Sequence, residues 1–148
     1  MNSPTALQTV DLLLVEDQSS DAELALRALR RLDLGMRIHR LKDGAEALDF
    51  VFGRNAYAER SVAEAPGLIL LDLKLPKVSG HEVLRALKSD ERTKQIPVIV
   101  LSSSGESSDV KQCYALGVNS YVVKPVDFDQ FTETVQCIGT YWMEMNET

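Results

Sequence analysis

Runs of consecutive apolar residues constrain the fold of this chain more than any other feature. The clearest lie at 10–17, 67–73 and 96–103, and two shorter ones lie at 36–41 and 120–125. An apolar run without alternation is typical of a parallel strand that is buried on both faces. Longer stretches with helical spacing separate the runs, so the chain alternates strand and helix five times.

This alternation predicts an α/β protein in which helices cover both faces of a parallel sheet. We expect the flavodoxin-like (βα)5 three-layer sandwich, whose strand order is 2-1-3-4-5. The polar, aperiodic segment 53–66 is predicted to be a long loop before the third strand. The last helix is predicted to begin near Asp127. Its apolar face follows a 3-4 spacing that places it on the sheet, and the face comprises Phe128, Phe131, Val135, Ile138 and Trp142.

Local signals predict where several helices begin and end. Three pairs have the spacing of a capping box, in which side chains satisfy the free N–H groups of the first turn. The pairs are Ser20 with Glu23, Asp43 with Glu46, and Ser79 with Glu82. Gly117 follows an apolar helical stretch and predicts a helix C-terminus.

Length and charge exclude several classes of protein. The 148 residues are enough for one domain, which we expect to span 10–148 after a flexible N-terminus at 1–9. A net charge of −6 lacks the basic footprint of a nucleic-acid-binding protein. No apolar run approaches the roughly 20 residues of a membrane span, and we see no signal peptide. The only two cysteines are expected to be reduced, which favours the cytoplasm.

Four of the predicted strands end in polar residues. Because ligand sites of parallel sheets lie beyond the carboxyl ends of the strands, we expect these residues to meet. They are Glu16 and Asp17 at the end of the first strand, Asp72 at the end of the third, Ser102 and Ser103 at the end of the fourth, and Lys124 at the end of the fifth.

Three adjacent carboxylates need a cation, and oxygen-only ligands favour Mg²⁺. Asp72 is then a plausible nucleophile toward a phosphoryl group, whose oxygens Lys124 and a serine hydroxyl would bind. An isolated aspartate at a strand end is more often a turn residue, so this interpretation depends on the whole set of residues.

The same residues resemble the receiver domain of two-component response regulators over about residues 10–143. The matching segments are "LLLVED", "LILLDLKLPKVSGHEVL", "IPVIVLSS" and "ALGVNSYVVKP". The resemblance implies transfer of a phosphoryl group from a phosphohistidine of a sensor histidine kinase to Asp72. It also implies Mg²⁺ held by Asp17, Asp72 and the Lys74 backbone carbonyl, with Glu16 acting through water.

The resemblance further implies that Ser102 and Lys124 contact the phosphoryl group, that Tyr121 changes rotamer as Ser102 moves, and that the Lys124–Pro125 peptide bond is cis. The signal would leave through a surface of the fourth helix, fifth strand and fifth helix. Such a protein is not an enzyme beyond its own phosphotransfer and autodephosphorylation. Tyr121 as plain packing at the edge of the core stays an alternative.

More narrowly, the chain is similar to the single-domain regulators that are paired with bacterial and cyanobacterial phytochromes. The supporting features are "LLVEDQSSDAELALRAL", the loop at 53–66 and the C-terminal "YWMEM". That group dimerises through its C-terminal half, so we expect a homodimer. The expected surface comprises Val110, Tyr114, Cys137, Tyr141 and Trp142, although helix packing alone would also explain an apolar last helix.

Two positions depart from the family pattern. Lys74 stands two residues after Asp72, where an asparagine is common, and Ser102 replaces the commoner threonine. The choice of Ser102 over Ser103 rests on strand register.

Two other functions stay open on the sequence. A Mg²⁺-dependent phosphohydrolase of the haloacid-dehalogenase type also forms an aspartyl-phosphate, but needs a second aspartate where this chain has Lys74. An adaptor receiver that is never phosphorylated would not need the acidic set.

Overall fold

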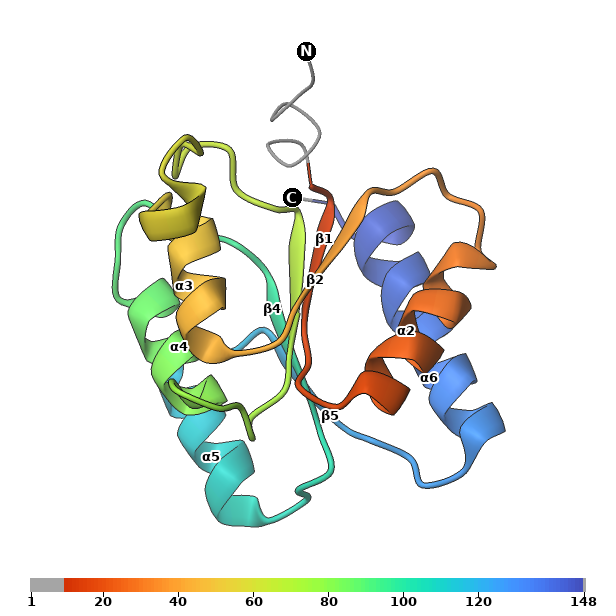
Figure 1. Ribbon diagram of the computed structural model, residues 1–148. Helices are drawn as coiled ribbons and strands as arrows, with labels where there is room; N and C mark the ends of the chain where they lie inside the picture. Colours follow the sequence, from red (N-terminus) through yellow and green to blue (C-terminus); the bar gives the residue numbers. More distant parts are fainter. Residues whose placement is uncertain (1–9, 148) are drawn as a thin grey trace.

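A computed structural model describes residues 10–147, so the predicted flexible segment 1–9 lies outside the described residues. Five parallel strands form one sheet in the order β2-β1-β3-β4-β5, as predicted (Figure 1). The strands are β1 (Leu12–Val15), β2 (Ile38–Leu41), β3 (Leu68–Leu71), β4 (Val98–Ser102) and β5 (Ser120–Val123).

Helices cover both faces of the sheet, so the fold is the expected flavodoxin-like three-layer sandwich. The helices are α2 (Ser19–Arg30), α3 (Gly44–Phe52), α4 (Gly80–Lys88), α5 (Ser107–Leu116) and α6 (Phe128–Thr140). Figure 1 shows α2 and α6 on one face and α3, α4 and α5 on the other. A π-helical turn (Tyr141–Met145) extends α6, and the loop at 53–66 contains a short 3-10 helix (Asn55–Tyr57).

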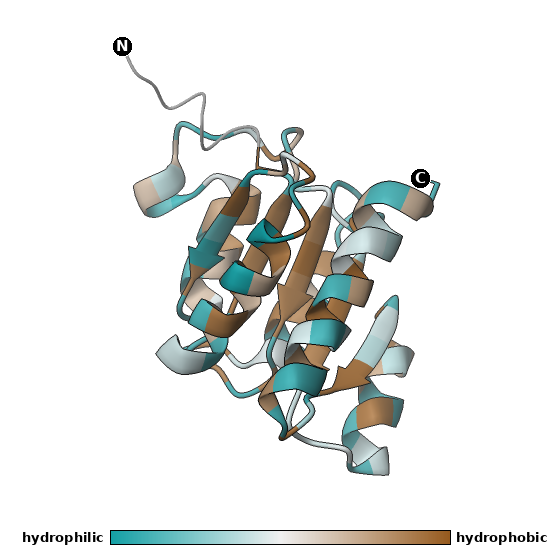
Figure 2. Ribbon diagram, turned by 90° about the vertical axis from the view of Figure 1, so that its right-hand side faces the viewer, coloured by the Kyte–Doolittle hydropathy of each residue, from teal (hydrophilic) through white to brown (hydrophobic). Residues whose placement is uncertain are grey.

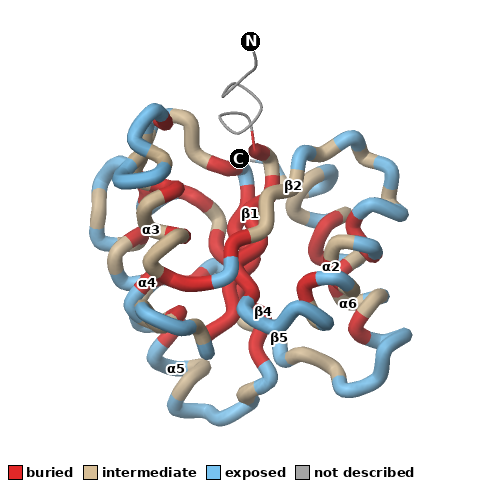
Figure 3. The backbone as a smooth tube through the Cα atoms, in the orientation of Figure 1, coloured by how far each residue is buried: buried red, intermediate tan, exposed pale blue. Residues whose placement is uncertain are grey.

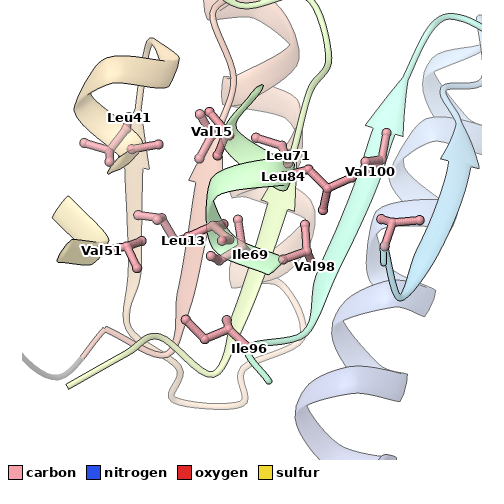
Figure 4. Packing of buried hydrophobic residues seen from close by; sticks show 14 of the residues in the cluster. Leu13, Val15, Leu41, Val51, Ile69, Leu71, Leu84, Ile96, Val98 and Val100 are labelled. Carbon is pink, nitrogen blue, oxygen red and sulfur yellow. The ribbon is translucent and has the colours of Figure 1, made fainter. Parts of the chain in front are cut away.

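The central strands bury consecutive residues because each face has its own core. Leu13 and Val15 belong to the core under α3, α4 and α5, whereas Leu12 and Leu14 belong to the core under α2 and α6. The side chains of the first core surround Leu84 of α4 (Figure 4). In Figure 2 the central strands are mostly apolar, and in Figure 3 they are buried along their length. Burial on both faces explains why the runs lack alternation.

Most of the predicted helix ends are confirmed. The Asp43 side chain accepts a hydrogen bond from the Glu46 N–H at 2.7 Å, and Ser79 accepts one from Glu82 at 3.3 Å. Gly117 ends α5 with a left-handed backbone, at φ 104°.

The predicted capping box at Ser20 is wrong. Helix α2 begins at Ser19, so its N-cap is Gln18, two residues before the predicted cap, and Gln18 makes no side-chain capping bond. The Gln18 N–H donates instead to the Glu16 carboxylate at 3.0 Å, so the chain enters this helix through a contact with the end of β1.

The predicted apolar face of α6 is correct in its middle and wrong at its start. Phe131, Val135 and Ile138 are buried, and Trp142 is half-buried against the same core. Phe128 is 70% exposed and follows the fully exposed Val126. Helical spacing correctly groups these residues, but the first residue of α6 lies beyond the core that the others reach.

Two glycines let neighbouring segments approach the loop after β3. A Cβ atom on Gly80 would overlap the carbonyl oxygen of Asp72, and one on Gly44 would overlap the carbonyl oxygen of Val78. The Gly80 N–H donates to the Leu73 carbonyl at 2.8 Å, and the Gly44 N–H donates to the Pro76 carbonyl at 3.3 Å. The loop at 72–79 is therefore held from two sides.

We expect Gly44→Ala to destabilise the fold by about 2–3 kcal/mol, because the new methyl group must displace backbone of the loop at 72–79. Urea denaturation measures this free energy of unfolding. Gly105→Ala is the matched control, since its Cβ would meet nothing closer than Val123 Cγ2 at 3.6 Å. Equal stability of the two variants would contradict the close approach.

A histidine in edge strand β2 predicts a pH dependence of stability. The His39 ring stacks on Phe50 at 5.0 Å between centroids, and its Nε2 has no hydrogen-bond partner within residues 10–147. Burial lowers the pKa of His39, the nearby Arg60 lowers it further, and Glu46 opposes the shift. The unfolded chain therefore takes up this proton at a higher pH than the folded protein does.

Stability should consequently fall as the pH drops below about 6.5, because the unfolded state then binds more protons. We expect His39→Gln to flatten this slope between about pH 7 and pH 5 in denaturation experiments. The unmodified protein is measured over the same pH range, and an unchanged slope in His39→Gln would contradict this origin of the pH dependence.

Candidate functional site

Parallel pairing brings four predicted site residues to one edge of the sheet. The pairing of Val15 with Leu71 places Glu16 and Asp72 side by side, one residue beyond each strand. The Asp72 N–H donates to the Val15 carbonyl at 3.1 Å, and the Lys124 N–H donates to the Ser102 carbonyl at 2.7 Å. The site therefore follows directly from the register of the strands.

The ammonium of Lys124 is the electrostatic centre of this edge. Its Nζ lies 2.8 Å from Glu16 Oε1, 2.8 Å from Asp21 Oδ2 and 3.7 Å from Asp72 Oδ2. Glu16 and Asp72 are both buried, so the lysine neutralises charges that water does not reach.

Asp21 was missed in the sequence analysis. It lies in the first turn of α2, directly after β1, and so belongs to the same edge of the sheet. This position in the sequence could have indicated that Asp21 lies near the site. However, an acidic residue in a first helical turn is common because it stabilises the helix by itself.

The pKa values of this cluster shift because of burial and the crowded charges. Burial raises the pKa of Glu16, with Asp72 acting in the same direction, although hydrogen bonds from Lys124 and Gln18 oppose the shift. Burial alone would lower the pKa of Lys124, but Asp21, Glu16 and Asp72 outweigh it, so that pKa is raised. Lys124 therefore keeps its proton among the three carboxylates, and the charge of Glu16 is costly to maintain because this residue is buried beside Asp72.

Asp17 lines a cavity of about 480 Å³ beside the cluster, together with Lys74, Ser102 and Ser104. Asp17 and Lys74 are exposed there, whereas Ser102 is fully buried. One oxygen of Asp72, Oδ1, accepts a hydrogen bond from the Leu73 N–H at 2.8 Å.

Glu16 is not available as a direct metal ligand in this arrangement. Lys124 binds its Oε1, and the Gln18 N–H binds its Oε2 at 3.0 Å. Accordingly, no group of three or more acidic, histidine or cysteine side chains within residues 10–147 is assembled as a metal site. Mg²⁺ commonly uses one or two carboxylates and several waters, so a site for this ion at the edge of the sheet does not require Glu16 as a direct ligand.

The three consecutive serines at 102–104 have different surroundings, because Ser102 and Ser104 line the cavity and Ser103 does not. Ser102 ends β4, and its Oγ accepts a hydrogen bond from the Ser104 N–H at 3.1 Å. Ser103 is exposed and does not line the cavity, so the structure does not bring it to the site. The register that favoured Ser102 over Ser103 therefore agrees with their positions.

A hydrogen-bonded rim on the same cavity was also missed. The Ser104 hydroxyl donates to Asp109 at 2.5 Å, and Asp109 lies 3.5 Å from His81 Nε2. The hydroxyl of Tyr121 donates to the Ser104 carbonyl at 2.7 Å. Tyr121, the predicted switch residue, is thus joined to the loop that follows Ser102.

The predicted cis peptide bond between Lys124 and Pro125 is wrong, because every peptide bond from residue 10 to 147 is trans. Trans is favoured over cis before proline by about 0.5–1 kcal/mol, so the dipeptide itself does not select cis. With the trans bond, Lys124 still donates to Ser102 and reaches the carboxylates.

The five residues of the predicted dimer surface lie in two different layers. Val110 and Tyr114 are on α5, whereas Cys137, Tyr141 and Trp142 are on α6 and its π-helical turn. Figure 1 shows these two helices on opposite faces of the sheet. Cys137 and Tyr141 line a largely apolar groove of about 590 Å³.

The remaining expectations concern cysteines and membranes. Cys113 is buried and Cys137 is exposed, and both are free thiols. Within the part of the chain that the structure describes, no helix has the length and apolar character to cross a membrane.

Comparisons with known proteins identify the family. Residues 12–136 match the response regulator receiver domain model. The probable methanogenesis regulatory protein FilR2 of Methanothrix harundinacea is 42% identical over 137 residues, which cover 93% of this chain and 86% of that protein. The response regulator Rcp1 of Synechocystis is 37% identical over 133 residues, 90% of this chain and 88% of Rcp1.

Solved structures agree with this assignment. The Mn²⁺-bound form of Rcp1 matches with a TM-score of 0.87 and 36% identity, covering 93% of this chain and 97% of that one. The phosphorylated cyanobacterial phytochrome response regulator RcpA matches with a TM-score of 0.87 and 37% identity, covering 93% and 96%. Fold, site and sequence thus agree, and the chain belongs to the response regulator receiver domain family.

Proposed function

We propose that this protein is a single-domain response regulator, in which Asp72 accepts a phosphoryl group from a phosphohistidine of a sensor histidine kinase. The observation that carries the proposal is the placement of Lys124 between two buried carboxylates, 2.8 Å from Glu16 and 3.7 Å from Asp72. A buried cation beside an aspartate and a buried serine hydroxyl suits a tetrahedral anion attached to that aspartate.

The proposed reaction is a substitution at phosphorus. A lone pair of an Asp72 carboxylate oxygen forms the new O–P bond as the P–N bond of the phosphohistidine breaks, and the departing imidazole nitrogen keeps that electron pair. Lys124 would neutralise charge on the phosphoryl oxygens, and the Ser102 hydroxyl would donate to one of them.

Bound Mg²⁺ supplies positive charge that balances the phosphoryl oxygens. Asp17, Asp72 and the Lys74 carbonyl would hold it, with Glu16 contributing through water. Lys74 is exposed on the wall of the same cavity, where it adds a positive charge beside the path of the incoming phosphoryl group.

The signal would pass from Ser102 to the β4–α5 loop and to Tyr121. Ser102 already bonds to Ser104, and Tyr121 donates to the Ser104 carbonyl, so a shift of Ser102 toward a phosphoryl oxygen would strain both contacts. The receiving surface comprises α5, β5 and α6. Phosphorylation would bias an equilibrium between two arrangements of this surface rather than create a new fold.

The proposed partner is a sensor histidine kinase, for which a phytochrome-type kinase is one candidate. It would act in the cytoplasm on residues 10–148, which form one receiver domain. Rcp1 and RcpA support the phytochrome link. FilR2, at 42% identity, is described as a methanogenesis regulator, so family membership alone does not select the stimulus.

A phosphohydrolase is disfavoured, because exposed Lys74 stands where such an enzyme needs a second aspartate as acid and base. The assembled acidic cluster with Lys124 likewise argues against a receiver that never carries a phosphoryl group. We propose instead a phosphoacceptor whose only catalysis is on itself.

Acetyl phosphate with Mg²⁺ should add one phosphoryl group to the protein, because it can replace the phosphohistidine donor. Intact-mass spectrometry measures the addition. Asp72→Asn should remain unmodified, since the amide is a poor nucleophile, and Asp109→Asn is the control that keeps the acceptor. Equal labelling of Asp72→Asn and the unmodified protein would refute the assignment.

We also propose that the protein forms a homodimer through Cys137, Tyr141 and Trp142, with Val110 and Tyr114 contributing. Light scattering at micromolar concentration should give a mass near twice 16.4 kDa. Tyr141→Asp should weaken association by about tenfold or more, because it places a charge in an apolar contact. Val126→Asp, at a fully exposed apolar position outside this surface, is the control. A species of 16.4 kDa alone, with and without acetyl phosphate, would contradict the dimer.

A further inference from the structure

The charged end of Lys124 is divided between two carboxylates that do not accept the phosphoryl group and one that does. Its Nζ lies 2.8 Å from both Glu16 and Asp21, but 3.7 Å from Asp72. We propose that Asp21 is a positioning residue that holds Lys124 away from Asp72 in the resting protein and competes with the phosphoryl group for the lysine. This inference rests on the proposed function and adds to it a residue that sets the balance between the two states.

Asp21 makes a short, charge-assisted hydrogen bond with Lys124. An ammonium has three N–H donors, and charge-assisted hydrogen bonds are short and strong. Two of those donors point to Glu16 and Asp21 at hydrogen-bond distance, and the Lys124 side chain is only 10% exposed. Asp72 lies beyond hydrogen-bond distance, so its interaction with Lys124 is a longer ion pair.

A phosphoryl group on Asp72 would require Lys124 to move toward it, and one of the two short contacts must then lengthen. The side chain of Glu16 is 4% exposed, so losing its cation would leave a carboxylate charge buried without compensation. The side chain of Asp21 is 34% exposed, so water can replace the ammonium there. Asp21 is therefore the partner that releases the lysine.

The position of Asp21 also lowers the cost of releasing the lysine. It lies in the first turn of α2, where the free N–H groups and the helix dipole stabilise a negative charge. The cost of releasing Lys124 is thus moderate, which suits a contact that must form and break during signalling.

Two simpler roles for Asp21 need to be separated from this one. An acidic residue in a first helical turn stabilises the helix by itself, and any nearby negative charge weakens anion binding through space. Neither role depends on Lys124. A double-mutant cycle with Lys124 therefore isolates the direct competition.

The experiment uses beryllofluoride with Mg²⁺ as a stable mimic of the phosphoryl group, with affinity measured by isothermal titration calorimetry. Asp21→Asn should bind the mimic about fivefold more tightly than the unmodified protein, because a competing charge-assisted contact has been weakened. Asp21→Ser, which keeps a residue suited to a helix start, should show the same gain. Glu23→Gln makes the same charge change on the same helix, at an exposed position that pairs with Arg27, and should leave the affinity unchanged.

In a Lys124→Gln background, Asp21→Asn should change the affinity by less than about twofold, since no lysine remains to be released. A second measurement needs neither metal nor mimic. The side-chain NMR resonance of Lys124 should shift in Asp21→Asn and stay in place in Glu23→Gln.

The outcomes separate the two levels of the proposal. If the unmodified protein does not bind beryllofluoride, the proposed function fails and the competition fails with it. If the unmodified protein binds but Asp21→Asn shows no gain, the competition alone is overturned. An equal gain in Glu23→Gln, or a gain that persists without Lys124, would also overturn it, because charge at a distance would then be the cause.

Discussion

Parallel pairing of β1 with β3 is the constraint on which the rest of the molecule depends. It buries both strands on both faces, because helices must cover each side of a parallel sheet. The same pairing makes Glu16 and Asp72 neighbours at the point where the strands end. Core and site are therefore products of a single register, and a slip of one residue would misplace both.

The charge arrangement at that edge then determines what the site can do. Two buried carboxylates are tolerated because Lys124, at the end of β5, lies close to both of them. Both oxygens of Glu16 are engaged, one by Lys124 and the other by the Gln18 N–H. Asp21 adds a partner for the lysine that water can replace. The site thus combines a largely buried ammonium group with a carboxylate partner, Asp21, that is partly exposed to water.

Helix ends that depend on hydrogen bonds between residues close in sequence are predicted correctly where no tertiary contact competes with them. The caps at Asp43 and Ser79 are local hydrogen bonds, and the spacing itself predicts them. The prediction of a cap at Ser20 is wrong because a contact outside the helix, between the Gln18 N–H and Glu16 at the end of β1, accompanies an earlier helix start. The predicted burial of Phe128 is wrong because helical spacing indicates which residues share a face of the helix, but it does not indicate where the core beneath that face ends.

The sequence of apolar runs and helical stretches was sufficient to predict a parallel α/β sheet and the edge at which Glu16, Asp72, Ser102 and Lys124 meet, because the carboxyl ends of parallel strands all lie on one side of the sheet. Tertiary structure alone decided the partners of each side chain at that edge. Asp21 reaches Lys124 from 103 positions away, and Ser104, Asp109 and His81 form a rim from separate elements. Such contacts depend on the rotamers and helix positions that packing selects, and no pattern of neighbouring residues encodes them.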